Sequence, residues 1–184
     1  SVQKNVLSEI QTIIKSSNVP EQLEISELPR AAALNTIKLN SDCKVVVESY
    51  FRDAPSQIAN SGSLPLRADN ATDFTIHWRI VNSFNALRDV TIKTTLPLWV
   101  EFTSQISGNY GQSLPAYDPL TRELSWKIDS VPAGSGVLTK AQELIFQIKV
   151  TPSQSHINQG INLIEQTVFT ATDAFTGKNI NLTY

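Results

Sequence analysis

The sequence predicts an all-β protein, an immunoglobulin-like β-sandwich with an N-terminal extension. Residues 94–102 look like a strand that is interrupted at Pro97, which cannot donate to a sheet ladder, and that then resumes. Residues 123–128 alternate polar and apolar side chains and lead into a turn that contains proline and glycine. About eight short segments of this kind follow one another with turn signals between them, and this spacing is typical of a sandwich.

The strands are predicted one by one from side chains that alternate between two faces. In residues 73–81 every second side chain is large and apolar: Phe74, Ile76, Trp78, Ile80. We expect strands at residues 44–50, 73–81, 87–95, 100–103, 123–128, 143–150, 162–172 and 179–183. Because Trp78 and Trp126 each lie among aliphatic residues, we expect both of them in one core.

The composition excludes several classes of protein. Of the 184 residues 41% are hydrophobic and 17% are charged, which allows a sizeable core and argues against a disordered chain. The net charge is -2 and the charges form no basic stripe, so we expect no nucleic-acid partner. No apolar stretch approaches the roughly 20 residues of a membrane-spanning helix, so we expect no membrane span within this chain. Because the chain opens at Ser1 with neither a methionine nor a signal peptide, we expect a processed or excised piece of a longer protein.

The N-terminal segment differs from the rest of the chain. Its apolar residues fit one face of a helix, and a subset of them also fits one face of a strand, so the pattern leaves both structures open. Residues 19–35 contain two prolines and a triple alanine, and we interpret them as a linker. We therefore expect a domain boundary near residue 38, with an N-terminal extension at residues 1–38 and the sandwich at residues 39–184.

No group of residues in the sequence suggests a catalytic or metal site. In an alternating run Cys43 shares one face with apolar residues, and it is expected to be a buried thiol. His77 is expected to be a solvent-facing or second-face residue of its strand, and His156 lies in a distant loop rich in serine and glutamine. The sequence contains no Gly-x-Ser-x-Gly motif. We therefore expect no enzyme activity, no metal ion and no cofactor.

Several segments together resemble a conserved surface repeat domain of unknown function from bacterial and archaeal proteins. The matching features are a strand that ends in Asn82, the pair Leu96-Pro97 followed by Val100-Glu101-Phe102, a strand with Trp126, the turn Val131-Pro132-Ala133-Gly134, and residues 169–177. The closing residues are most similar to versions from environmental small-genome bacteria. The resemblance covers about residues 39–183 and implies an immunoglobulin-like domain of a large exported cell-surface protein, without site residues of its own. Residues 1–38 depart from it and look like the tail of a preceding module.

The leading hypothesis is a non-enzymatic structural module of an exported cell-surface protein or surface filament. Its partners would be other copies of itself or adjacent modules, outside the cell. Self-assembly would run through the apolar N-terminal residues Val6, Leu7, Ile10, Ile13 and Ile14. This segment would be donated as a strand to the open sheet edge of a neighbouring copy. Alternatively, it packs on its own domain or belongs to an upstream module.

A second hypothesis comes from a different class of function. The domain would be an adhesion module that recognises a glycan or a protein through the loops at its ends. The loop at residues 104–117 is rich in tyrosine, asparagine and glutamine, as are the binding loops of antibodies. The candidate ligand-binding residues are Trp99, Asn109, Tyr110 and Tyr117.

Overall fold

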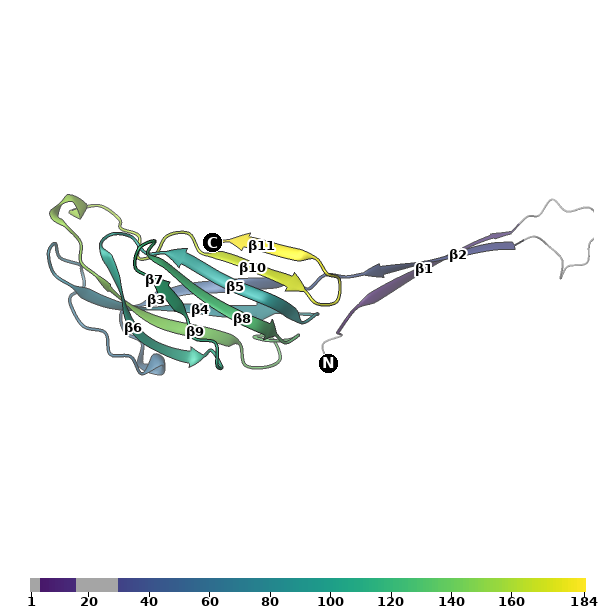
Figure 1. The fold of residues 1–184 in the computed structure, drawn as a ribbon, viewed down its shortest axis with the longest axis horizontal. Coiled ribbons are helices and arrows are strands. Elements are labelled where there is room, and N and C mark those ends of the chain that lie inside the picture. Colours follow the sequence, from purple (N-terminus) through teal and green to yellow (C-terminus); the bar gives the residue numbers. More distant parts are fainter. Residues whose placement is uncertain (1–3, 16–29) are drawn as a thin grey trace, which may run out of the picture.

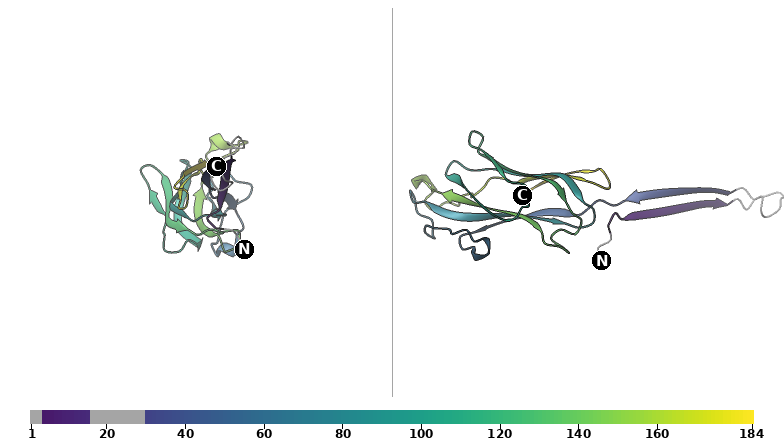
Figure 2. Two further views of the ribbon diagram at one scale, coloured as in Figure 1. Left: turned by 90° about the vertical axis from the view of Figure 1, so that its right-hand side faces the viewer. Right: turned by 60° about the horizontal axis from the view of Figure 1, so that its bottom comes forward.

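The computed structural model of the protein describes residues 4–15 and 30–184. It contains a two-stranded ribbon and a β-sandwich, and the ribbon projects from one end of the sandwich (Figure 1). The ribbon is formed by β1 (Leu7–Lys15) and β2 (Arg30–Lys38), which pair antiparallel. Figure 2 shows that the ribbon also stands clear of the sandwich in a second orientation. The apolar N-terminal segment is thus a strand, and the helix that the sequence left open is not formed.

The sandwich consists of two sheets whose neighbouring strands are antiparallel. The first sheet has the order β3 (Cys43–Tyr50), β4 (Thr72–Asn82), β9 (Gln142–Val150), β6 (Val100–Asn109). The second sheet has the order β11 (Asn179–Thr183), β10 (Val168–Asp173), β5 (Leu87–Thr95), β8 (Glu123–Val131), β7 (Ala116–Asp118). Two short 3-10 helices, η2 (Ala54–Ser56) and η3 (Gln154–His156), lie in loops. No helix in the described part of the chain is long and apolar enough to cross a membrane.

The strand order is that of an immunoglobulin-like fold. The strands β3, β4, β9 and β6 take the places of A, B, E and D, and β5, β10 and β11 take those of C, F and G. The β7–β8 hairpin extends the second sheet beyond β5, where variable-type domains add two strands. Here, however, the hairpin follows β6 in the chain. The predicted fold class, an immunoglobulin-like β-sandwich with an N-terminal extension, is confirmed.

One hydrophobic core lies between the two sheets and contains both predicted tryptophans. Trp78 and Trp126 are completely buried. The ring of Trp78 packs edge-on against Phe146, with 4.9 Å between the ring centroids. The indole Nε1 of Trp126 donates to the carbonyl oxygen of Ser113 over 2.8 Å, so its polar atom is satisfied inside the core. The predicted core is therefore confirmed.

The elements differ from the sequence prediction in several places, among them β7, which was not predicted, and β8, which continues to Val131. The strand that was expected to end at residue 103 continues as β6 to Asn109, because a bulge between Phe102 and Ile106 absorbs residues that break the alternation. Conversely, β10 begins only at Val168, although a strand was expected from residue 162. The expected linker at residues 19–35 overlaps β2, which starts at Arg30, and residues 19–29 lie outside the described residues.

Candidate assembly site

The ribbon has two faces of different character. Directly opposite residues of an antiparallel pair point to the same face, and successive residues point to opposite faces. One face, here called the uncharged face, carries Ser8, Ile10, Thr12 and Ile14 of β1 opposite Ile37, Asn35 and Ala33 of β2. The other, here called the charged face, carries Leu7, Glu9, Gln11 and Ile13 opposite Lys38, Thr36, Leu34 and Ala32. The sequence analysis did not resolve these faces, because they follow from the register of two strands.

Both faces of the ribbon present large apolar side chains to solvent. On the uncharged face these are Ile10, Ile14 and Ile37, and on the charged face Leu7, Ile13 and Leu34. The exposed fraction of these six residues ranges from 45% to 66%. A two-stranded hairpin without a covering layer is marginally stable in water at best. The ribbon therefore gains stability from any partner that covers it.

The outer edge of β1 offers a row of backbone hydrogen-bonding groups. The amide of Leu39 donates to the carbonyl of Val6 over 3.1 Å, so these two residues form a hydrogen-bonded pair. Hydrogen-bonded and non-hydrogen-bonded pairs alternate along an antiparallel ladder, so the even-numbered residues of β1 bond to β2. The N–H and C=O groups of Glu9, Gln11 and the other odd-numbered residues point away from β2. Within the described residues β1 pairs with β2 alone.

Of the predicted self-assembly residues, the structure places four on β1. Leu7 and Ile13 lie on the charged face, and Ile10 and Ile14 lie on the uncharged face. Val6 immediately precedes β1 and joins the ladder only through its carbonyl. Their use in assembly remains a proposal.

A buried carboxylate anchors the ribbon to the sandwich. Asp173, at the end of β10, accepts from the amide of Ser41 over 2.7 Å and from Asn85 Nδ2 over 2.8 Å. Its second oxygen accepts from the amides of Phe175 and Thr176, each over 2.9 Å. Asn85 Nδ2 also donates to the carbonyl of Leu39 over 2.8 Å. The segment between β2 and β3 is thus tied to two loops of the sandwich.

The hydrogen bonds to Asp173 also determine its ionisation. Burial raises the pKa of Asp173, but the hydrogen bonds from Asn85 and from three backbone amides outweigh burial, so the pKa lies below its usual value. At the ribbon itself, Lys38 Nζ donates to the carbonyl of Phe175 over 3.4 Å and lies 4.9 Å from the centre of its ring. These contacts fix where the ribbon leaves the sandwich.

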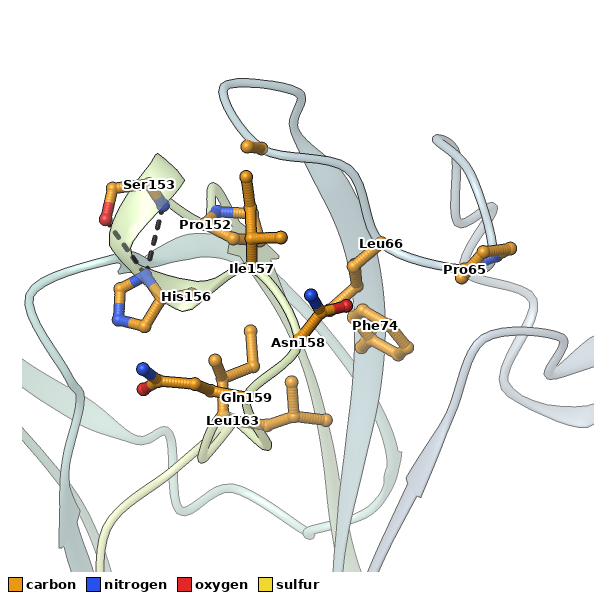
Figure 3. Close-up of a pocket in the computed structure, with 12 residues that line it drawn as sticks. Pro65, Leu66, Phe74, Pro152, Ser153, His156, Ile157, Asn158, Gln159 and Leu163 are labelled. Carbon is orange, nitrogen blue, oxygen red and sulfur yellow. Dashed lines mark hydrogen bonds between the residues drawn. The ribbon is translucent and has the colours of Figure 1, made fainter.

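The end of the sandwich away from the ribbon contains a pocket of about 640 Å³ (Figure 3). Its lining includes Leu66, Phe74, Ile157 and Leu163. His156 borders it, and His156 Nδ1 forms hydrogen bonds with the amide and the hydroxyl of Ser153 (Figure 3). Asn158 and Gln159 also line the pocket, so its wall combines apolar and polar side chains (Figure 3).

The structure does not bring the four predicted ligand-binding residues together. Trp99 lies just before β6 at the pocket end, where its ring packs against His156 at an angle of 60°, with 4.5 Å between centroids. Asn109 and Tyr110 lie at the other end of β6, and Asn109 Nδ2 donates to the carbonyl of Ala141 over 2.8 Å. Tyr117 is on β7 and packs beside Phe102, with 5.5 Å between ring centroids.

A charged cluster on the outer face of the first sheet was missed by the sequence analysis. His77 on β4 contacts Asp53 through Nε2 over 2.7 Å and Glu143 through Nδ1 over 3.0 Å. Of the two expected placements, solvent-facing or on the second face of the strand, His77 takes the second, and there it is buried. Burial raises the pKa of Asp53, but hydrogen bonds from His77, Thr75 and Ser56 outweigh it, so the pKa lies below its usual value. No local motif could have found this cluster, because Asp53 and Glu143 are far apart in the sequence.

The single cysteine is not activated as a nucleophile, and a metal site is absent from the part of the chain that the structure describes. Among residues 4–15 and 30–184, no three or more His, Cys, Asp or Glu side chains are arranged to hold a metal ion. Cys43 is half-buried, and burial, together with the charges of Asp42 and Asp173, raises the pKa of its thiol to about 11. A thiol with this pKa is protonated at neutral pH and is a poor nucleophile.

Comparisons with known proteins give a likeness only at the level of structure. A scan against models of protein families found no match, and a search of curated proteins found none either. Among solved structures, a variant of BcpA, the major pilin subunit of Bacillus cereus, matches with a TM-score of 0.47 and 8% identity over 96% of this chain and 53% of that one. The full-length major pilin SpaD from Corynebacterium diphtheriae matches with a TM-score of 0.43 and 9% identity over 98% of this chain and 58% of that one.

A second BcpA structure matches with a TM-score of 0.43 and 7% identity over 99% of this chain and 65% of that one. The chain thus spans less than two thirds of the length of each of these subunits.

Proposed function

We propose that this chain is a non-enzymatic structural module of an exported cell-surface protein or surface filament, and that its copies associate through the N-terminal ribbon. The observation that carries the proposal is the ribbon itself. It projects from the sandwich, it exposes large apolar side chains on both faces, and the outer edge of β1 is open. An open, apolar edge strand is a template for pairing with another chain.

The energetics favour a partner that both covers a face and extends the sheet. Complete burial of one isoleucine side chain contributes roughly 1.5–3 kcal/mol, and the three on the uncharged face are already about half covered. Association costs about 4–15 kcal/mol in lost freedom of motion. Apolar contact with one face offsets only part of this cost, so backbone pairing along β1 has to contribute as well.

Two further observations support a structural role. The resemblance of residues 39–183 to conserved surface repeats supports a module that lies outside the cell. The buried polar groups of the sandwich also serve the fold, since Asp173 receives four hydrogen bonds from protein donors and His77 is held between two carboxylates. Groups that are fully engaged in this way are positioned to stabilise loops.

The first test is deletion of residues 1–38. We expect the remaining residues 39–184 to keep a cooperative thermal transition in circular dichroism, because the core lies entirely within them. We expect the full chain to self-associate at high concentration in sedimentation velocity, and the shortened chain to remain monomeric. A full chain that stays monomeric at millimolar concentration would contradict the proposed function. A shortened chain that does not fold would contradict the division into an extension at residues 1–38 and a sandwich at residues 39–184.

Ligand binding is a second candidate function, and the pocket at the end of the sandwich away from the ribbon is the observation that favours it. A pocket of about 640 Å³ is large enough for a small ligand. Filling it through Leu66→Trp should abolish any signal that the protein gives on a glycan array. Tyr110→Ala is the control, because Tyr110 lies at the opposite end of β6. A signal that disappears with Tyr110→Ala and survives Leu66→Trp would exclude the pocket.

A further inference from the structure

The two open sides of the sandwich differ in how well they are protected against strand addition. On one side, β6 carries a bulge between Phe102 and Ile106, and β7 has only three residues. Bulges and very short edge strands are features that block pairing with another chain. On the other side, β3 and β11 pair with their neighbours without any shift of register. This second side, here called the open side, is therefore the better acceptor.

The open side also exposes part of the core. A cavity of about 340 Å³ lies between the starts of β3 and β11. Apolar residues of both strands, Cys43, Val47, Ile180 and Leu182, are only partly buried along this side. An added strand that turns apolar side chains toward the interior would complete their burial.

The direction in which the backbone groups point distinguishes β11 from β3 as the acceptor. Tyr184 and Thr167 exchange two hydrogen bonds, of 2.9 and 3.0 Å, so the even-numbered residues of β11 bond to β10. The outward backbone groups of β11 therefore belong to Asn179, Asn181 and Thr183. The side chains of these three residues are exposed, and those of Ile180 and Leu182 turn toward the core.

An antiparallel pair of β1 with β11 matches the two strands face by face. The outward backbone groups of β1 belong to its charged-face residues, so Glu9 and Gln11 would lie opposite the exposed Asn and Thr side chains of β11. With Glu9 opposite Thr183 and Gln11 opposite Asn181, Ile10 would lie opposite Leu182 and Thr12 opposite Ile180, with their side chains toward the interior. The polar Glu9 and Gln11 thus meet polar residues on the outer face, and Ile10 meets Leu182 on the interior face.

The edge of β3 does not offer this match. The amide of Ser83 donates to the carbonyl of Asp42 over 2.9 Å, so the outward backbone groups of β3 belong to its odd-numbered residues, including the buried Val45. An antiparallel β1 would turn Glu9 toward the core, and an unpaired buried charge is strongly unfavourable. The amide of Val45 is also already bonded to the hydroxyl of Tyr184, over 3.0 Å.

From these observations we propose that β1 of one copy pairs antiparallel with β11 of a second copy, with the uncharged face of the ribbon closing the open side. This proposal rests on the proposed function, self-association through the ribbon, and identifies β11 as the strand that accepts β1. It is compatible with a filament, because β1 runs away from its own sandwich, whereas β11 runs from the ribbon end toward the pocket end (Figure 1). Antiparallel pairing therefore lets successive copies point in the same direction. Such a head-to-tail contact does not close on itself.

The donor strand is tested with two isoleucines of β1 that lie on opposite faces of the ribbon and are almost equally exposed. Ile10 is 50% exposed and Ile13 is 51% exposed, on opposite faces of β1. We expect Ile10→Glu to raise the Kd of self-association at least about 100-fold, because it moves a charge into the interface. Ile13→Glu should change the Kd by less than about tenfold. Equal losses in the two variants would overturn the sidedness of the contact.

The test of the acceptor is Asn181→Pro. Proline at this position removes an outward amide of β11 that is not used by the β10–β11 ladder, so the sandwich should keep its thermal transition. We expect this variant to be monomeric, and Asn181→Ala, which keeps the amide, to associate like the unchanged chain. If Asn181→Pro associates normally and Ile10→Glu does not, the ribbon remains the donor and β11 is not the acceptor. Failure of the unchanged chain to associate would instead contradict the proposed function.

A mixing experiment separates this contact from a symmetric one between two ribbons. Ile10→Glu lacks a working donor and keeps its β11 edge, whereas Asn181→Pro lacks the acceptor and keeps its ribbon. We expect each variant alone to be monomeric and the equimolar mixture to form dimers, without longer species, in sedimentation velocity. A mixture that remains monomeric would overturn the proposal.

Discussion

Replacing Trp126 with alanine is expected to lower the free energy of unfolding by about 3–5 kcal/mol. The side chain is completely buried between the sheets, and the neighbouring core residues cannot collapse fully into the space it leaves. The substitution also removes the donor that satisfies the carbonyl oxygen of Ser113. Urea unfolding followed by far-ultraviolet circular dichroism measures the loss.

Leu120→Ala is the matched control for this prediction. Leu120 is 94% exposed, so its truncation removes little buried surface and should change stability by less than about 0.5 kcal/mol. If Trp126→Ala lowers the free energy of unfolding as little as Leu120→Ala does, the assignment of Trp126 to the core is wrong.

The core could be predicted because it depends on local patterns. In β4 and β8 every second residue is apolar, and this alternation alone identifies the inward side chains, including both tryptophans. The bulge in β6 breaks the alternation, and the expected strand therefore stopped too early. The triple alanine before residue 34 has weak strand propensity, and it forms part of β2 because it is paired with β1.

The candidate assembly site could be predicted only in part, because its properties depend on pairing between strands. The sequence identified the apolar N-terminal residues, and it did not identify their partner strand. The difference between Ile10 and Ile13 follows from the register with β2, and the choice of β11 as acceptor follows from which of its amides bond to β10. The cluster around His77 also depends on strand pairing, because the pairing of β4 with β9 brings Glu143 next to His77.

Asp173 shows how a residue that looks ordinary in the sequence becomes central in the fold. In the sequence it is one polar residue before a turn. In the structure it is completely buried and receives four hydrogen bonds, which join the end of β10, the loop after β4 and the segment that leads to the ribbon. The carboxylate thereby couples the stability of the sandwich to the placement of the ribbon.

We expect Asp173→Asn to destabilise the protein by about 3 kcal/mol or more. The amide group of asparagine would face two buried donors that now bond to a carboxylate oxygen, and each buried donor left without an acceptor costs about 1–3 kcal/mol. Asp118→Asn is the matched control, because Asp118 accepts similar bonds from Leu120 and Thr121 in an exposed turn. Urea unfolding at neutral pH should show a much smaller loss for Asp118→Asn than for Asp173→Asn.

A comparison of the unchanged chain with Asp173→Asn also tests how the stability of the protein depends on pH. Because the pKa of Asp173 is lower in the folded protein than its usual value of about 3.9, its ionised form stabilises the fold. This contribution is present in full above about pH 4 and is lost as the pH falls through the lower folded pKa. The stability difference between the unchanged chain and Asp173→Asn should therefore be constant from pH 7 to about pH 5 and shrink below about pH 4. A difference that stays constant down to about pH 2 would show that the charge of Asp173 does not contribute.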